Sequence, residues 1–197
     1  NMIPFVVNPT PKIELIHDDK ICSGVNNVPV TLNVGLQSGS LTNYNYEWFL
    51  GGALIPGATA ATLPVTVDGN YTTTVTDIIT GCKMTRINNL TYSQAATITD
   101  VIVNDISENN SVIISIDPNS IGRYEYSIDN PNGPFQDSAF FENVEAGFHT
   151  VYVNDKDGCG IASKVIAVIG APHFFTPNGD GFNDFWSIKG VNAIFNK

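Results

Sequence analysis

Charged residues are scarce in this chain: only 14% of its 197 residues are Asp, Glu, Lys or Arg. Basic residues are the rarer kind, with 9 Lys and Arg against 19 Asp and Glu, so the formal net charge is −10. A protein that binds nucleic acid or an anionic membrane surface presents a basic patch. The charge therefore argues against both as partners, whereas an acidic excess helps to keep an extracellular protein soluble.

Long apolar stretches are also lacking. No run approaches the roughly 20 residues that cross a membrane as a helix, and no signal peptide stands at Asn1. We expect the export signal on sequence outside this chain, and we expect residues 193–197 to lie inside an unfinished domain. Apolar residues show no 3.6-residue period bounded by caps, which argues against helices.

The usual signatures of catalysis and metal binding are absent as well. The three histidines, His17, His149 and His173, stand alone, without the paired spacing of metal ligands. The sequence has no GxSxG, no HExxH and no phosphate-binding glycine loop. It therefore predicts that the chain is not an enzyme and needs no catalytic cofactor.

What the chain does contain is strand and turn formers. Hydrophobic residues make up 43% of the sequence, with many Val, Ile, Thr, Tyr and Phe, which favour strands. Gly, Asn, Asp and Pro punctuate them and favour turns. Short strands at this spacing are typical of β-sandwiches such as immunoglobulin-like domains. The expected strands are 13–16, 29–35, 44–50, 62–67, 71–76, 83–92, 98–103, 112–116, 124–128, 140–144, 149–153 and 162–169.

The two halves of the chain resemble each other at an offset of 78 residues. Tyr46-Glu47-Trp48 matches Tyr124-Glu125-Tyr126. The same offset pairs Pro56 with Pro134, Leu63 with Phe141, Gly69 with Gly147, Val75 with Val153 and Asp77 with Asp155, and Cys82 meets Cys159 after a one-residue slip. One offset across a whole module predicts a tandem repeat. The alternative is two sandwiches that share only the general pattern.

The order Cys22, Trp48, Cys82 in the first half resembles that of immunoglobulin-like domains, in which a tryptophan packs on a disulfide between the sheets. The resemblance implies a Cys22–Cys82 disulfide, and two free buried thiols are the alternative. Cys159 is expected to be a buried thiol. Tyr44, Tyr46 and Trp48 alternate with polar residues, which indicates one face of a core strand. An exposed aromatic site for glycans is the other interpretation.

Turn formers and aromatic residues crowd residues 174–188, which read FFTPNGDGFNDFWSI. Glycines after Asn178 and Asp180 permit positive φ, so two tight turns can follow each other. This stretch resembles the opening motif of the gliding-motility-associated C-terminal domain, the type B sorting domain of Bacteroidetes type IX secretion substrates. The residues that carry the resemblance are Phe175, Thr176, Pro177, Asn178, Gly179, Asp180, Gly181, Asn183, Asp184 and Trp186.

The resemblance implies a cell-surface, outer-membrane-associated protein. It would be exported by the type IX secretion translocon with a PorP/SprF-like outer-membrane partner, as in SprB-like gliding adhesins. The expected function is the C-terminal stalk and secretion or anchoring region of a large adhesin, whose further partners are surface glycans. The alternative is the spacer, glycan-binding and sorting region of a secreted hydrolase. Export by this route predicts that a fusion ending at Lys197 fails to sort, because most of the sorting domain is missing.

The fold class predicted is all-β, with tandem immunoglobulin-like β-sandwich modules followed by the first part of a β-sandwich sorting domain. Residues 1–9 form a linker or the tail of a preceding module. Residues 10–93 and 94–170 form the two modules. Residues 171–197 begin the sorting domain.

Two further sites are open at the sequence level. Asn178, Asp180 and Asp184 offer oxygens that calcium prefers, but Thr176 and Ser187 occupy the positions where a calcium loop carries its strongest ligands. The favoured alternative is that these side chains, with Asn183, bond to backbone N–H groups and brace a double turn. In addition, Asp137-Ser138-Ala139 resembles the short O-glycosylation signal of Bacteroidetes surface proteins, which makes Ser138 a candidate acceptor.

Overall fold

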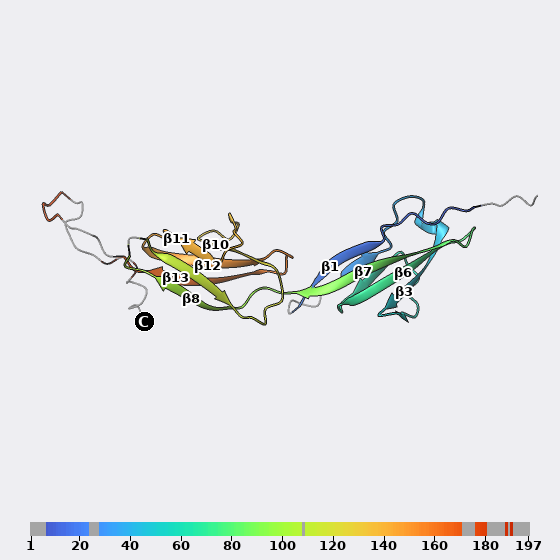
Figure 1. The fold of residues 1–197 in the computed structure, drawn as a ribbon, viewed down its shortest axis with the longest axis horizontal. Coiled ribbons are helices and arrows are strands. Elements are labelled where there is room, and N and C mark those ends of the chain that lie inside the picture. Colours follow the sequence, from blue (N-terminus) through green and yellow to red (C-terminus); the bar gives the residue numbers. More distant parts are fainter. Residues whose placement is uncertain are drawn as a thin grey trace, which may run out of the picture. The chain divides into compact units, whose positions relative to one another are not determined.

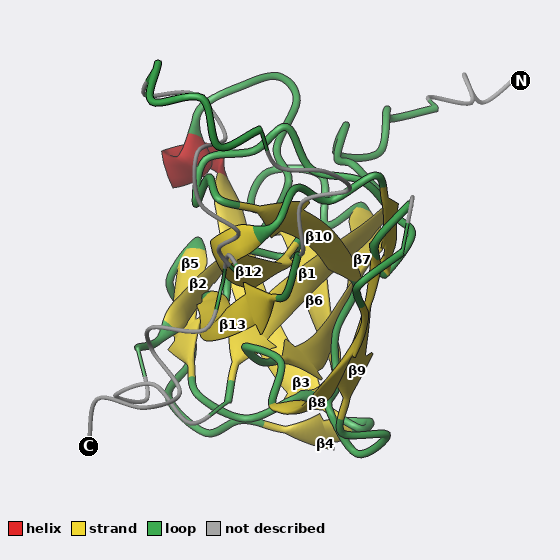
Figure 2. Cartoon of the chain, turned by 90° about the vertical axis from the view of Figure 1, so that its left-hand side faces the viewer, coloured by secondary structure: helices red, strands yellow, loops and turns green. Residues whose placement is uncertain are grey.

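The computed structural model describes residues 7–23, 28–107, 109–170, 176–180, 188 and 190. The chain forms two compact units, Asn1–Ser93 and Gln94–Lys197. Within these described residues, both consist of strands joined by turns, with one short 3-10 turn, η1, at Leu41–Asn43 (Figure 2). In the part of the chain that the structure describes, no helix has the length and apolar character needed to cross a membrane.

Unit 1 contains a five-stranded sheet in the order β1-β7-β6-β3-β4 and a two-stranded sheet of β2 and β5. Figure 1 shows β1, β7, β6 and β3 side by side. All pairs are antiparallel except β1 with β7, which run parallel. The strands are β1 (Ile16–Cys22), β2 (Val30–Asn33), β3 (Tyr44–Leu50), β4 (Ala53–Leu54), β5 (Thr62–Val65), β6 (Gly69–Asp77) and β7 (Lys83–Ser93).

Alternation along β3 explains how one side of this strand packs into the core of unit 1. Tyr46 and Trp48 point into the core and are 6% and 0% exposed, while Glu47 between them is exposed. The indole Nε1 of Trp48 donates to the carbonyl of Ala60 at 2.9 Å, so its one polar atom is satisfied. The interpretation of this strand as a core face is therefore confirmed.

Unit 2 contains two three-stranded sheets, β10-β12-β13 and β11-β9-β8. Val112, Val151, Val153 and Val168 are fully buried between them. Together with unit 1, this layering confirms the all-β, immunoglobulin-like sandwich class. The strands are β8 (Ile98–Asn104), β9 (Ser111–Ile116), β10 (Tyr124–Ile128), β11 (Phe140–Glu142), β12 (Gly147–Asp155) and β13 (Ile161–Val168).

The 78-residue offset recurs in the strands themselves. β5, β6 and β7 begin at residues 62, 69 and 83, and β11, β12 and β13 begin at 140, 147 and 161. The turn before the last strand keeps the same offset, because Asp77 N–H donates to Cys82 O at 2.9 Å and Asp155 N–H to Gly160 O at 3.0 Å. Gly160, not Cys159, therefore stands at the place of Cys82. The expected one-residue slip is wrong.

These turns are built around an aspartate at the end of the preceding strand. The carboxylate of Asp77 accepts from the N–H of Thr80 at 2.8 Å and of Ile79 at 3.0 Å. The Thr80 backbone bond is the main reason that the pKa of Asp77 lies below its ordinary value. The carboxylate of Asp155 accepts from the N–H of Cys159 at 3.1 Å in the corresponding turn.

The first strands of the two units are where the repeat breaks. In unit 1, β1 runs parallel to β7 along its whole length, whereas β8 in unit 2 pairs antiparallel with β9. We expected the first strand at 13–16, but Ile13 makes only an isolated bridge to Leu36, and β1 begins at Ile16. β1 has the sequence IHDDKIC, in which four consecutive polar residues interrupt the apolar–polar alternation that predicts a strand.

Candidate functional sites

The cysteine assignment differs from the expectation. Cys22 and Cys159 are disulfide-bonded, and Cys82 is a free, half-buried cysteine. The predicted Cys22–Cys82 disulfide is therefore wrong, and so is the free thiol expected at Cys159. The Sγ of Cys82 lies 3.8 Å from the carbonyl oxygen of Asn8.

The register inside unit 1 explains why Cys22 and Cys82 do not meet. Cys22 lies opposite Ser93, the last residue of β7, while Cys82 directly precedes the first residue of that strand. Eleven residues of strand therefore separate the two ends, which is about 36 Å at 3.3 Å per residue. A disulfide needs Cα atoms within about 7 Å of each other. The order Cys, Trp, Cys carries no information about this distance.

The sorting motif lies only partly within the described residues. Phe175, Gly181, Asn183, Asp184 and Trp186 fall outside them. Between Thr176 and Asp180, the backbone N–H of Asn178 donates to Thr176 O at 2.8 Å, and Gly179 has a φ of 77°. This positive φ agrees with the turn that the Asn-Gly pair predicts.

Asn178 and Asp180 bond to each other in this turn. Asn178 Oδ1 accepts from the N–H of Asp180 at 3.2 Å, and Asn178 Nδ2 donates to the Asp180 carboxylate at 2.8 Å. This is the kind of bracing contact that the structural alternative to a calcium loop requires. Across the described parts of the chain, no three His, Cys, Asp or Glu residues form a group suited to a metal ion. Asp184, the third calcium candidate, lies outside them.

Ser138, the candidate glycan acceptor, is exposed in the loop before β11. Its Oγ accepts from the N–H of Phe140 at 3.2 Å, and its carbonyl accepts from Gln136 Nε2 at 2.8 Å. The neighbouring Asp137 forms an ion pair with Lys156. The loop is thus held open to solvent with the serine hydroxyl at the surface, and its modification stays a prediction.

Aromatic side chains on β3 do not form an exposed glycan site. Trp48 is fully buried, Tyr46 is nearly so, and the Tyr46 hydroxyl donates to Leu41 O at 2.7 Å. Burial is the main cause that raises the pKa of Tyr46 above its ordinary value. The glycan interpretation of this strand is therefore wrong.

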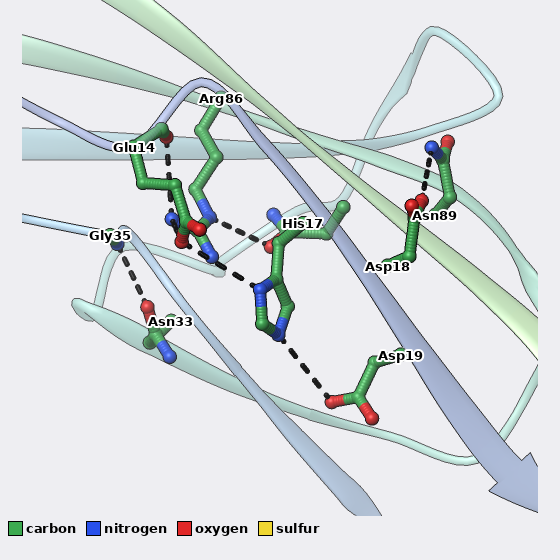
Figure 3. A network of polar contacts seen from close by, with 9 residues as sticks. Glu14, His17, Asp18, Asp19, Asn33, Gly35, Arg86 and Asn89 are labelled. Carbon is green, nitrogen blue, oxygen red and sulfur yellow. Dashed lines mark hydrogen bonds and ion pairs between the residues drawn. The ribbon is translucent and has the colours of Figure 1, made fainter. Parts of the chain in front are cut away.

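A buried charge network that the sequence did not reveal lies in unit 1. Arg86 on β7 is 1% exposed, and its Nη1 lies 2.7 Å from Glu14 Oε2. Its Nε donates to Asn88 Oδ1 at 2.9 Å. Figure 3 shows Glu14 between Arg86 and His17, whose Nδ1 is 3.7 Å from the same carboxylate oxygen. Glu14 and Arg86 are 72 positions apart in the sequence, so no local sequence pattern predicts that they form an ion pair.

The close packing of Arg86 depends on a glycine. Gly35 has a φ of 65°, and a Cβ at this position would lie 1.7 Å from Arg86 Nη1. The carbonyl of Gly35 accepts from the N–H of Glu14 at 2.8 Å. Gly35 therefore lets the segment that carries Glu14 close over the guanidinium.

Near the start of both β6 and β12, a side chain bonds to a backbone carbonyl four residues before it. The Tyr71 hydroxyl donates to Val67 O at 2.9 Å, which is the tyrosine corner of immunoglobulin-like sandwiches. Both residues shift by 78 in unit 2, where His149 Nε2 lies 2.7 Å from Glu145 O. His149 therefore replaces the corner tyrosine.

His149 makes a second contact that Tyr71 does not make: its Nδ1 lies 2.6 Å from Asp129 Oδ2. Both ring nitrogens thus lie within hydrogen-bond distance of an oxygen. The ring borders a shallow pocket of about 250 Å³, whose lining includes Asp129, Phe141, Glu142, Asn143 and Glu145.

No family model and no curated protein matches this chain. Solved structures that resemble it are tandem immunoglobulin-domain proteins. Drosophila OTK extracellular domains 3–5 are 12% identical over 85% of this chain and 69% of that one, with a TM-score of 0.33. The first eight immunoglobulin domains of Down syndrome cell adhesion molecule are 11% identical over 85% of this chain and 25% of that one (TM-score 0.45). Titin tandem domains A164–A165 are 12% identical over 80% and 94% (TM-score 0.32).

Proposed function

We propose that the chain is the stalk and sorting region of a large cell-surface adhesin exported by the type IX secretion system. The observation that carries the stalk function is the repeat. The last three strands of the two immunoglobulin-like units start at a 78-residue offset, and both cores are filled by side chains. Such units act as spacers because each buries its own core and needs no neighbour to fold.

The cellular location is supported by the disulfide. Disulfides persist in secreted and surface proteins and are rare in the reducing cytosol. Cys22 and Cys159 are disulfide-bonded, which fits an exported protein. The net charge of −10 fits the same location.

The export route rests on the resemblance of residues 174–188 to the type B sorting motif. To test it, a fluorescent reporter is fused to the natural C-terminal region that contains residues 94–197 and whatever follows them. Export is compared in a Bacteroidetes host with an intact type IX translocon and in a translocon deletion strain. We expect surface or medium fluorescence only in the first, and loss of a PorP/SprF-like partner to reduce it. Equal export in both strains refutes this route.

The second candidate function is that of the spacer, glycan-binding and sorting region of a secreted hydrolase. The pocket beside His149 favours it, because polar side chains next to Phe141 are the groups that hold a sugar ring. A glycan array probed with the full chain and with the Phe141→Ala variant measures this directly. Binding that disappears in the variant supports a glycan-binding module, and the absence of binding leaves the stalk function.

A further inference from the structure

The edge of the sheet in unit 1 is closed by a parallel strand. Asp77 N–H donates to Cys82 O, so these residues form a hydrogen-bonded pair of the antiparallel β6–β7 ladder. In such a ladder, residues alternate between bonding to the neighbouring strand and pointing their backbone groups away from it. The N–H and C=O of the odd-numbered β7 residues therefore point away from β6. Ile87 is one of these residues. Its N–H donates to Leu15 O at 2.7 Å, and β1 continues beside β7 from Ile16 onwards. The outward backbone groups of β7 are therefore satisfied.

Among the described residues, no strand covers the corresponding edge in unit 2. Asp155 and Gly160 form the equivalent hydrogen-bonded pair, so Ile161, Ser163 and Val165 turn their backbone groups away from β12. Val165 stands 78 residues after Ile87. Within the described residues, the strand that would cover this edge, β8, pairs with β9 instead, and β12 is the strand paired with β13.

The segment that follows β8 bonds to the residue that follows β13. Ile106 N–H donates to Ile169 O at 3.1 Å, and Asp105 accepts from Ile169 N–H at 3.0 Å. The side chains of Ile161 and Val165 are 43% and 68% exposed. In the part of the chain that the structure describes, no strand pairs with the outer side of β13 from Ile161 to Val165, so this stretch offers backbone donors and acceptors to an extended chain.

The charge at this edge indicates what would fit. Lys164 stands 78 residues after Arg86, the residue that unit 1 buries under the carboxylate of Glu14. Ile166 and Val168, on the same side of β13, are buried, whereas Lys164 is exposed. It is exposed because, among the residues that the structure describes, no segment like the one carrying Glu14 lies over it. Unit 2 therefore has the cation, Lys164, but its described residues include no acidic strand beside it like the segment that carries Glu14 in unit 1.

We propose that the edge of β13 between Ile161 and Val165 binds an extended acidic segment of a partner protein as an added parallel strand. The partner's backbone carbonyl takes the N–H of Val165, as Leu15 takes that of Ile87. A carboxylate one residue before that carbonyl contacts Lys164, as Glu14 contacts Arg86. This is β-strand addition with a charge that selects the partner.

A second copy of this chain fits the edge less well. Two β13 edges side by side would bring two lysines to one seam, and β13 contains no acidic residue to offset them. An acidic partner strand turns the same lysine into an attraction. The proposal concerns unit 2 alone and does not depend on the export route.

Unit 1 supplies a probe for the experiment. A labelled peptide with the sequence of Lys12–Ser23, carrying Ser in place of Cys22, is titrated with the full chain, and binding is followed by fluorescence anisotropy. We expect saturable binding, with NMR shift changes concentrated at the amides of Ile161, Ser163 and Val165. The same peptide with Glu14→Gln should bind more weakly, because the contact with Lys164 loses its charge.

Two variants of the full chain test the edge itself. Val165→Pro removes an outward N–H without touching the β12 ladder, as prolines do on natural edge strands, and should lower the affinity at least about tenfold. Lys164→Glu should lower it by a similar factor. Lys83→Glu, a matched charge reversal on β7, should leave the affinity unchanged. Amide hydrogen exchange in β12 checks that each variant is folded.

Three outcomes overturn the proposal. They are the absence of peptide binding, equal binding by the Val165→Pro and Lys164→Glu variants, and self-association of the chain that these variants abolish without any peptide binding. The last outcome would assign the edge to a second copy.

Discussion

At the scale of single residues, the least expected feature is the buried guanidinium of Arg86. Its contacts are Asn88 Oδ1 at 2.9 Å, Glu14 Oε2 at 2.7 Å and Glu14 O at 3.3 Å. A buried charge is costly unless it is paired and hydrogen-bonded. Glu14 supplies both the charge and a backbone acceptor, so this one residue decides whether Arg86 is tolerated in the core.

Removing the carboxylate should therefore destabilise unit 1 more than removing the acid from an exposed site. We expect Glu14→Ala to lower the free energy of unfolding by about 2 kcal/mol, because a charged donor is left buried without its partner. Glu14→Gln keeps an acceptor oxygen and should recover part of the loss. Urea unfolding followed by unit 1 amide signals measures the effect.

Glu47→Ala is the matched control, because Glu47 is an exposed strand glutamate. It should change the free energy of unfolding by less than about 0.5 kcal/mol. Equal losses for Glu14→Ala and Glu47→Ala would show that the ion pair adds nothing to the fold.

At the scale of elements, the corner before β6 and its counterpart before β12 differ in chemistry. Tyr71 makes one bond there, to Val67 O at 2.9 Å, whereas His149 makes contacts with Glu145 O and Asp129. Phenylalanine at either position keeps a ring and removes the polar contacts. We expect Tyr71→Phe to cost about 1 kcal/mol, and His149→Phe to cost more because it loses two contacts. Hydrogen exchange in β6 and β12 measures each unit separately.

The corner tyrosine also has a pH signature. Burial raises the pKa of Tyr71 above its ordinary value, and the carboxylate of Asp68 adds to the shift. A raised pKa means that the folded state favours the neutral phenol. Its contribution is full below the ordinary pKa of about 10 and is lost as the pH rises through the folded-state value. Tyr71→Phe should therefore flatten the alkaline decline in the stability of unit 1, and an unchanged decline would contradict this explanation.

Strands with a clear alternation were predictable from the sequence, and strands held by their neighbours were not. The alternation of Tyr46 and Trp48 with polar residues placed β3 correctly, because period-2 burial is a local property. β1 was missed because its pairing with β7 comes from register across the unit and not from its own residues. For the same reason neither Glu14 nor Arg86 was found, since burial of a charge depends on what closes over it.

At the scale of the whole molecule, the repeat offset was visible in the sequence and recurs in the strand starts, but the pairing of cysteines was not predictable. Order along the chain suggested Cys22 with Cys82, whereas the parallel β1–β7 register puts them at opposite ends of one sheet. Sequence order constrains a disulfide only when it also fixes the distance between Cα atoms. The repeat offset does point to the corner contact of unit 2, because His149 lies 78 residues after Tyr71.

Peptide mapping tests the cysteine arrangement directly. Alkylation of the native, unreduced chain followed by digestion and mass spectrometry should place the label on Cys82 and leave Cys22 and Cys159 unlabelled, because both of these are disulfide-bonded. Cys82→Ser should abolish labelling and leave thermal unfolding nearly unchanged, because the thiol makes only a long contact with Asn8 O. Cys22→Ser should instead lower the unfolding temperature, since loss of a native disulfide removes a constraint on the unfolded chain. A linked peptide pair holding Cys22 and Cys82, with the label on Cys159, would contradict the register of β1 and β7 as well as the disulfide.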